Sequence, residues 1–504
     1  MRKVSKFYWI LCFLLLAFCG CIEQKETAEN KQPNIVFLFA DDQRYNTISA
    51  LGNNEIITPH LDQLVQTGTS FTNAYIMGAM NGAVCAPSRA MLMTSRNVFQ
   101  IQPAPAANLN MTDTLLPRAL SNGGYKTFHT GKWHNGKKAF AAAFDAGSKI
   151  FFGGMNDQYA VPTHEFNIAG NYADSLITIS TSHSSELYAN AAINFIENVK
   201  EDTAPFFMYV AFQAPHDPRE MPQKYLDMYP SDQVKIPENF MPRHPFDNGE
   251  LDIRDEWLAG FPRTKEEVKA NIIAYYAMIT HLDVQIGRIL HALNKSGLRD
   301  DTVIVFSSDN GLAVGQHGLM GKQNLYEHSI KVPLIFQGPN IPKNVQKETF
   351  TNLIDIYPTL CNIATSEVPS LVEGKNLLPV IHGKEKEVHQ SLIYAYKNNQ
   401  RAIRKGDYKL IKYRVDEQTQ NQLFNLQSDP WELQNLYNKE EYKNLISELE
   451  TALQKQLNKA GDGVQFTEPN WGVPTLPRWI ESVSQKTQDW LRGLAEKERK
   501  MRGF

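Results

Sequence analysis

The sequence predicts an α/β sandwich with a large mixed, mostly parallel sheet and a smaller C-terminal α+β subdomain with a short antiparallel sheet. Three almost continuously apolar runs, at 34–40, 206–212 and 302–306, are typical of strands buried on both faces of a parallel sheet. Apolar residues at helical spacing over 272–290 separate the second run from the third. Strands that alternate with helices favour this architecture.

Composition excludes several classes of protein. The chain has 504 residues, of which 42% are hydrophobic and 21% charged, so it is neither disordered nor a small disulfide-stapled domain. A formal net charge of −3 gives no reason to expect a nucleic-acid partner. Three of the five cysteines lie in the first 21 residues, which leaves too few for a disulfide framework.

The N-terminus predicts an export signal over residues 1–20 and a polar tether over 21–32. Basic residues precede the apolar stretch 7–18, which is too short to span a bilayer comfortably. The sequence Cys-Gly-Cys that follows resembles a bacterial lipobox, with Cys21 as the lipidated residue. We therefore expect an exported lipoprotein held in the outer membrane, on its surface or periplasmic face. The alternative is an ordinary cleaved signal and a soluble periplasmic protein.

The remaining elements follow in order. Residues 33–385 are predicted to form the large domain, in which Thr58 caps a helix that has Pro59 in its first turn. The pattern of predicted elements changes near residue 385, and 386–504 is predicted to form the smaller subdomain. Its predicted elements are short strands at 391–396, 408–413 and 423–426 and a helix near 440–457.

Polar residues follow all three apolar runs. Asp41 and Asp42 follow the first run, His216 lies just after the second, and Asp309 and Asn310 follow the third. Ligands of open α/β sheets bind beyond the carboxyl ends of the strands. The sequence therefore predicts a site at this edge.

The segment 85–96, CAPSRAMLMTSR, is the most informative one. A lone cysteine in an exported protein is ordinarily a buried or oxidised thiol. Here, however, Cys-x-Pro-Ser-Arg followed by Thr and Arg resembles the signature of the formylglycine-dependent sulfatases, which have the alkaline-phosphatase-like fold. Ser95 stands where that family normally has glycine. The resemblance implies that a formylglycine-generating or sulfatase-maturating enzyme oxidises Cys85 to 3-oxoalanine.

The resemblance also implies a metal site. Its ligands would be Asp41, Asp42, Asp309, Asn310 and the modified Cys85. Hard oxygen ligands suit Ca²⁺ or Mg²⁺ better than zinc, and the carboxylate-rich set favours Ca²⁺. Helix capping or a turn is the alternative for the first pair, but two acidic residues at the end of an apolar strand are costly without a cation.

Five further positions match the family's pattern. Two of them lie in the segment Gly-Lys-Trp-His: Lys132 would contact a sulfate oxygen, and His134 would hydrogen-bond the hydrated aldehyde. Lys322 resembles the second sulfate-binding lysine, and Arg89 resembles the arginine that holds the hydrate and its metal. His216 would face the leaving oxygen. Taken singly, each lysine or histidine is more often a solvated or structural residue.

The same resemblance implies a mechanism. One hydroxyl of the hydrated aldehyde attacks sulfur, and His216, together with Lys322, protonates the leaving oxygen. The second hydroxyl then loses its proton to His134, and collapse to the aldehyde expels sulfate. The metal and the two lysines neutralise the sulfate oxygens.

Substrate choice is less readable. His317 is a candidate for the sugar pocket and Arg219 for specificity, with a structural loop histidine and a surface salt bridge as the alternatives. Insertions near 140–170 and 240–262 carry His164, His244 and Arg254 as candidate pocket walls. We expect a sulfated algal polysaccharide such as ulvan or carrageenan, or its oligosaccharides, with glycosaminoglycans or mucin next. The rivals are a phosphonate monoester or phosphodiester hydrolase and a glycan-binding lipoprotein without activity.

Overall fold

The computed structural model describes residues 32–101, 109, 113–474, 484–490 and 493. Residues 33–504 group into one compact unit. The predicted signal, most of the tether and Cys21 lie outside the described residues. Within the described part of the chain, no helix is both long and apolar enough to cross a membrane.

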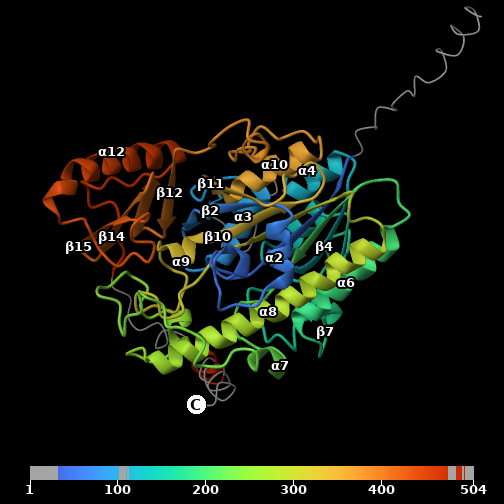
Figure 1. Ribbon diagram of the computed structural model, residues 1–504, viewed down its shortest axis with the longest axis horizontal. Helices are drawn as coiled ribbons and strands as arrows, with labels where there is room; N and C mark the ends of the chain where they lie inside the picture. Colours follow the sequence, from blue (N-terminus) through green and yellow to red (C-terminus); the bar gives the residue numbers. More distant parts are fainter. Residues whose placement is uncertain (1–31, 102–108, 110–112, 475–483, 491–492, 494–504) are drawn as a thin grey trace, which may run out of the picture. The chain divides into compact units, whose positions relative to one another are not determined.

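A large mixed sheet forms the centre of this unit (Figure 1). Its strand order in the described residues is β11-β2-β10-β9-β1-β8-β4-β5. β9, β1, β8, β4 and β5 run parallel, whereas β10 is antiparallel to both of its neighbours. The strands are β1 (Asn34–Ala40), β2 (Thr69–Tyr75), β4 (Lys126–Lys132), β5 (Ala146–Phe151), β8 (Phe206–Ala211), β9 (Thr302–Ser308), β10 (Lys331–Gln337) and β11 (Val345–Asn352).

Helices cover both faces of this sheet, because its central strands are apolar on both sides. Phe37 and Phe39 of β1 pack into one core with α3, α4 and α10, whereas Val36 and Leu38 pack into a second core with α2, α6 and α8. The α-helices are α2 (Pro59–Gln66), α3 (Cys85–Thr94), α4 (Leu116–Asn122), α5 (Lys137–Ala143), α6 (Ser184–Val199), α7 (Gln223–Leu226), α8 (Lys265–Lys295), α9 (Glu327–Ile330), α10 (Ile356–Ile363), α11 (Leu378–Ile381) and α12 (Lys443–Ala460).

A smaller sheet has the order β15-β14-β13-β12-β3 in the described residues. Its strands are β3 (Gly78–Ala79), β12 (Ser391–Tyr396), β13 (Gln400–Lys405), β14 (Tyr408–Val415) and β15 (Gln418–Asn425). The last four form an antiparallel meander that packs on α12, and β3 joins β12 in parallel. β3 is followed by α3, so this sheet contacts the chain just before Cys85.

The predicted fold class is confirmed. β1 has the predicted bounds, β8 and β9 differ from the prediction only at their C-terminal ends, and α8 extends the predicted helix in both directions. Thr58 is the N-cap of α2, but its hydroxyl bonds Asp62 Oδ1 and the backbone of Ser49 instead of a helix amide. The domain boundary at residue 385 stays a prediction.

Candidate active site

The predicted site residues meet at the carboxyl edge of the large sheet. β1 pairs in register with both β8 and β9, so the residues that follow these three strands meet beyond their ends. The Asp41 amide donates to Ala214 O (3.1 Å), and the Asp42 amide donates to Asp309 Oδ1 (3.0 Å). Lys132 ends β4, the next strand along, and His216 follows β8. Parallel pairing therefore brings together groups that are up to 280 residues apart in sequence.

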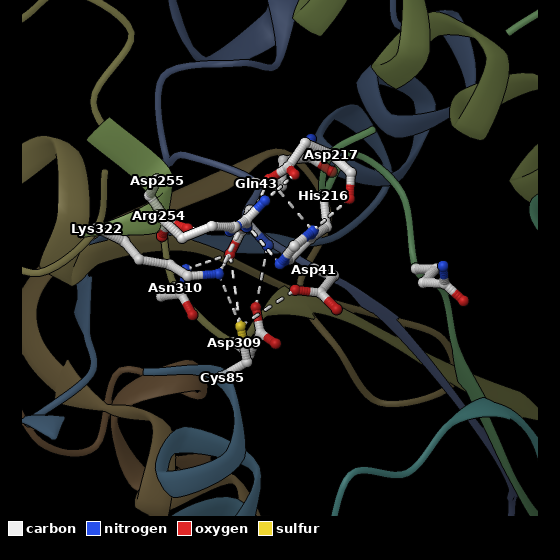
Figure 2. A network of polar contacts seen from close by, with 12 residues as sticks. Asp41, Gln43, Cys85, His216, Asp217, Arg254, Asp255, Asp309, Asn310 and Lys322 are labelled. Carbon is white, nitrogen blue, oxygen red and sulfur yellow. Dashed lines mark hydrogen bonds and ion pairs between the residues drawn. The ribbon is translucent and has the colours of Figure 1, made fainter. Parts of the chain in front are cut away.

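Cys85 is the first residue of α3 and is 4% exposed. Its Sγ lies 3.4 Å from Asp41 Oδ1, 3.7 Å from Asp42 Oδ1 and 2.9 Å from Lys322 Nζ (Figure 2). Burial and the Asp41 carboxylate raise the pKa of the thiol well above its usual range. An unmodified Cys85 is therefore a neutral thiol at pH 7 and a poor nucleophile.

The departure at Ser95 has a structural explanation. Ser95 ends α3 in the left-handed region, with φ 53°, where glycine is the usual residue. Its hydroxyl donates to Ile354 O (2.7 Å) and accepts from the Gly374 amide (3.1 Å). These two hydrogen bonds, one buried and one partly buried, offset the cost of a side chain in this conformation.

Three buried cations face three buried carboxylates. Arg89 donates through Nε to Asp309 Oδ2 (2.9 Å), while its Nη2 lies 2.9 Å from the same oxygen and 3.3 Å from Asp41 Oδ2. Lys132 Nζ pairs with Asp41 Oδ2. Lys322 Nζ lies 2.6 and 2.9 Å from the two oxygens of Asp42.

These charges shift the acidities of their neighbours. Burial opposes ionisation of Asp41, but Lys132 and Arg89 outweigh it and hold its pKa well below the usual range. Burial and the charge of Asp41 raise the pKa of Asp309 to about 6. Burial also works against the charge of Lys322, but Asp42 raises its pKa well above the usual value, so Lys322 stays protonated.

The residues at this edge fit a hard divalent cation. One donor atom each from Asp41, Asp42, Cys85 and His216 lies within 4.8 Å of all the others. Asn310 donates from Nδ2 to Asp42 Oδ1 (2.6 Å), whereas its buried Oδ1 has no hydrogen-bond partner among the described residues. An unsatisfied amide oxygen beside carboxylates is a donor that calcium or magnesium accepts.

The two predicted histidines differ in their surroundings. His216 Nδ1 lies 2.7 Å from Asp217 O and 3.4 Å from Asp217 Oδ1, and Nε2 lies 3.7 Å from Asp42 Oδ2. An Nδ1–H that donates to Asp217 O fixes the tautomer and leaves Nε2 facing the carboxylates. His134 adopts φ 61°, and burial together with Lys132 and Arg89 lowers its pKa well below the usual value. His134 is therefore neutral at pH 7.

Sequence reasoning missed the residues behind His216. Arg254 pairs with both oxygens of Asp217, donating from Nη2 to Oδ1 at 3.0 Å, and lies 2.8 Å from Asp255 Oδ1 (Figure 2). Asp255 also accepts a hydrogen bond from Gln323, next to Lys322. Asp217 directly follows a predicted catalytic residue, which was the one available signal. The sequence predicts Arg254 only as a candidate pocket wall.

The candidate substrate residues are both buried. His317 stacks on Tyr326, with ring centroids 4.0 Å apart, and its Nε2 lies 3.2 Å from Asn239 Nδ2. Arg219 donates to Asn271 Oδ1 (2.8 Å) and lies over the Tyr275 ring. Their roles in substrate recognition stay predictions.

The candidate wall histidines also have identified neighbours. His244 Nδ1 contacts His317 O at 2.9 Å, and the His164 ring packs between those of Phe152 and Tyr172.

Comparison with known proteins agrees with this arrangement. The sulfatase family model matches residues 33–366, and that of the N-sulphoglucosamine sulphohydrolase C-terminal region matches residues 315–459. An ulvan-active sulfatase of Formosa agariphila is 28% identical over 90% of this chain and 86% of its own. An N-acetylglucosamine-6-O-sulfatase of Bacteroides thetaiotaomicron is 26% identical over 88% of this chain and 89% of its own.

A solved structure that contains the substrate D-glucosamine-2-N,6-O-disulfate has the same fold. It superposes with a TM-score of 0.74 and 24% identity, covering 86% of this chain and 99% of the other. The family match extends over more than half of the chain and includes Cys85. Such membership implies a formylglycine and a divalent metal. The chain therefore belongs to the sulfatase family and is a sulfuric ester hydrolase.

Proposed function

We propose that this enzyme removes sulfate from a carbohydrate, namely a sulfated algal polysaccharide such as ulvan or carrageenan or its oligosaccharides. The observation that carries the proposal is the placement of Cys85 Sγ among Asp41, Asp42 and Lys322 at the edge of the sheet. Relatives that act on ulvan and on N-acetylglucosamine 6-sulfate support a sugar substrate. Glycosaminoglycan or mucin is the second candidate, favoured by the N-acetylglucosamine-6-O-sulfatase relative.

The nucleophile and the metal follow from the donor set. Formylglycine made from Cys85 would supply, as its hydrate, one hydroxyl as the nucleophile for sulfur and a second hydroxyl that allows release. Asp41, Asp42, Asp309 and Asn310 would hold Ca²⁺, with Mg²⁺ as the alternative, and the bound cation would neutralise sulfate oxygens. Arg89 fixes two of these carboxylates.

The protein's own side chains bind the anion and move the protons. Lys132 and Lys322 are buried cations whose ammonium groups bind sulfate oxygens and the charge that develops on them. His216, whose Nδ1 is held by Asp217, points Nε2 into the site to protonate the leaving oxygen. His134 is neutral and accepts the proton that is lost when sulfate departs.

The route to the mature enzyme is part of the proposal. The predicted lipobox supports export and an anchor at Cys21 in the outer membrane. The intact Cys-x-Pro-x-Arg core supports conversion by a formylglycine-generating or sulfatase-maturating enzyme. No nucleic acid takes part. Labelling with palmitate in the native host, compared with a Cys21→Ala variant, tests the anchor; equal labelling of both proteins contradicts it.

A substrate panel tests the function. Matured enzyme should release sulfate from oligosaccharides of ulvan or carrageenan, and should turn over an aryl sulfate far better than an aryl phosphodiester or phosphonate monoester. Cys85→Ala is the control and should be inactive on every compound. Faster cleavage of the phosphodiester would favour the rival hydrolase, and release only from glycosaminoglycans would favour the second candidate. Binding without any release would favour the glycan-binding lipoprotein.

A further inference from the structure

A cavity lies next to the loops that build the active site. It has a volume of about 420 Å³, within the usual range for small-ligand sites. Its lining comes from six separated segments, and the residues used below are Arg44, Asn46, Asn53, Tyr276, Gln316 and Trp431. Arg44 follows Asp42 by two residues, and Gln316 lies between Asn310 and Lys322. The active-site loops after β1 and β9 therefore also line this cavity.

Arg44 is a buried cation without an anion. It is 2% exposed, and its Nε and Nη1 are buried with no hydrogen-bond partner in the described chain. No ion pair joins it to a described carboxylate, and its guanidinium lies 5.2 Å from the Tyr275 ring centroid. An unpaired charge held out of water costs several kcal/mol.

Other buried arginines show what Arg44 lacks. Arg89 pairs with Asp309, Arg263 with Glu256 and Arg401 with Asp462. Each of these has a carboxylate within the fold, whereas Arg44 lines an open cavity instead. A ligand that carries sulfate or carboxylate would supply the missing acceptors, because both groups match the donor geometry of guanidinium.

Lys235, Glu55 and Glu238 also line the cavity, and four other lining residues suit a sugar ring. Tyr276 and Trp431 contribute aromatic surface, and the half-buried Trp431 is accessible. Asn53 Nδ2 donates to Tyr276 OH (3.1 Å) and to the backbone carbonyl of Asn46 (2.8 Å), which fixes the Asn53 amide beside the ring. The buried Oδ1 of Asn46 has no partner among the described residues, so it can accept a hydrogen bond from a hydroxyl.

We propose that this cavity is a subsite for an anionic pyranose, with Arg44 binding its sulfate or carboxylate and Trp431 packing against its ring. This inference rests on the proposed carbohydrate substrate and deepens it, since the shared loops make the cavity a place for a second sugar unit of the same chain. The enzyme would then bind an oligosaccharide in preference to a single sulfated sugar.

Binding by calorimetry in a Cys85→Ala background, which prevents turnover, tests the subsite directly. The probes are a carrageenan hexasaccharide, its desulfated form and a hexagalacturonate, so that sulfate and carboxylate are compared. Arg44→Gln should weaken binding of an anionic hexasaccharide at least tenfold and leave the desulfated one unchanged. Trp431→Ala should weaken all hexasaccharides that bind. The control Arg118→Gln, in an exposed ion pair with Asp145, should change nothing.

Kinetics of the active enzyme separate failure of the subsite from failure of the proposed function. With Cys85 intact, Trp431→Ala should raise KM for the sulfated hexasaccharide at least tenfold, with kcat and aryl-sulfate kinetics within twofold. Unchanged hexasaccharide binding in both pocket variants, or no binding of either anionic hexasaccharide to the Cys85→Ala parent, overturns the subsite. Equal losses on aryl sulfate and hexasaccharide also overturn it. An enzyme that releases no sulfate refutes the proposed function, whereas the calorimetry still decides whether the cavity binds anionic sugar.

Discussion

Replacement of Arg89 by Met should destabilise the metal-free protein, because Arg89 holds the carboxylate cluster together. Its guanidinium is 1% exposed and makes two contacts of 2.9 Å with Asp309 Oδ2, one of 3.3 Å with Asp41 and one of 3.0 Å with Lys132 O. Methionine keeps similar length but leaves two buried carboxylates short of one cation. Breaking a buried pair in this way costs about 3–5 kcal/mol.

The expected shift in the apparent Tm follows from this free-energy cost and the size of the protein. An unfolding entropy of about 2 cal/mol/K per residue over roughly 470 residues gives about 1 kcal/mol/K, so the apparent Tm should fall by about 3–5 °C. In excess Ca²⁺ the loss should shrink by at least half, because a bound cation replaces the missing charge. Arg89→Lys keeps the charge but lacks the bidentate geometry of guanidinium, so the free energy of unfolding should fall by about 1–3 kcal/mol.

Differential scanning calorimetry with chelator and with Ca²⁺ measures both effects. Arg118→Met is the matched control: its ion pair with Asp145 is partly exposed, so it should cost less than about 1 kcal/mol. An Arg89→Met protein that unfolds within ~1 °C of wild type would refute the reasoning on buried charge. An equal loss with and without Ca²⁺ would refute the cation site.

Further predictions concern other groups. Asp41→Asn and Asp309→Asn should each weaken Ca²⁺ binding about 100-fold or more by calorimetry and abolish sulfate release; retained turnover would show that they are not metal ligands. Asp217→Asn should lower kcat on aryl sulfate about 10–100-fold with KM nearly unchanged, because His216 loses its carboxylate but keeps the bond to Asp217 O. Asp217→Glu should restore part of the rate, and the exposed Asp227→Asn is the control. Unchanged kcat would exclude a positioning role. Burial raises the pKa of Asp283 to about 7, so this carboxyl is protonated in the folded protein but ionised in the unfolded chain between pH 4 and 7, and stability falls as pH rises through that window. Asp283→Asn should remove about 3 kcal/mol of this fall between pH 4.5 and 8, measured by urea unfolding at pH 4.5, 6 and 8, and parallel profiles for the two proteins would contradict the assignment.

Local signals explain why the sheet centre was predictable. β1 is uniformly apolar and ends in charged residues, so both its bounds and its carboxyl-end polar pair follow from sequence. β13 was not predicted, because four of its six residues are polar. Arg401 pairs with Asp462, and Arg404 with Glu327 and Tyr75, which buries these charges through partners more than 60 residues away.

The site likewise contains residues that local motifs predict and residues that only the tertiary structure brings together. Cys85, Lys132 and His216 lie in motifs that resemble a known family, and the structure places them together. The link from Arg254 through Asp217 to His216 joins residues 37 apart, and no local pattern records it. The cavity around Arg44 joins six segments and is visible only once the chain has folded. Pairings that tertiary structure creates therefore required coordinates.

The central claim is that Cys85 becomes the formylglycine of a sulfatase, and the mass of one peptide tests it most directly. Trypsin should release Tyr45–Arg89, in which Cys85 is the only cysteine. In protein purified from its native host, this peptide should have lost one sulfur and two hydrogens and gained one oxygen, and it should react with a hydrazide. Unmodified cysteine in a preparation that still releases sulfate from an aryl sulfate would contradict the account.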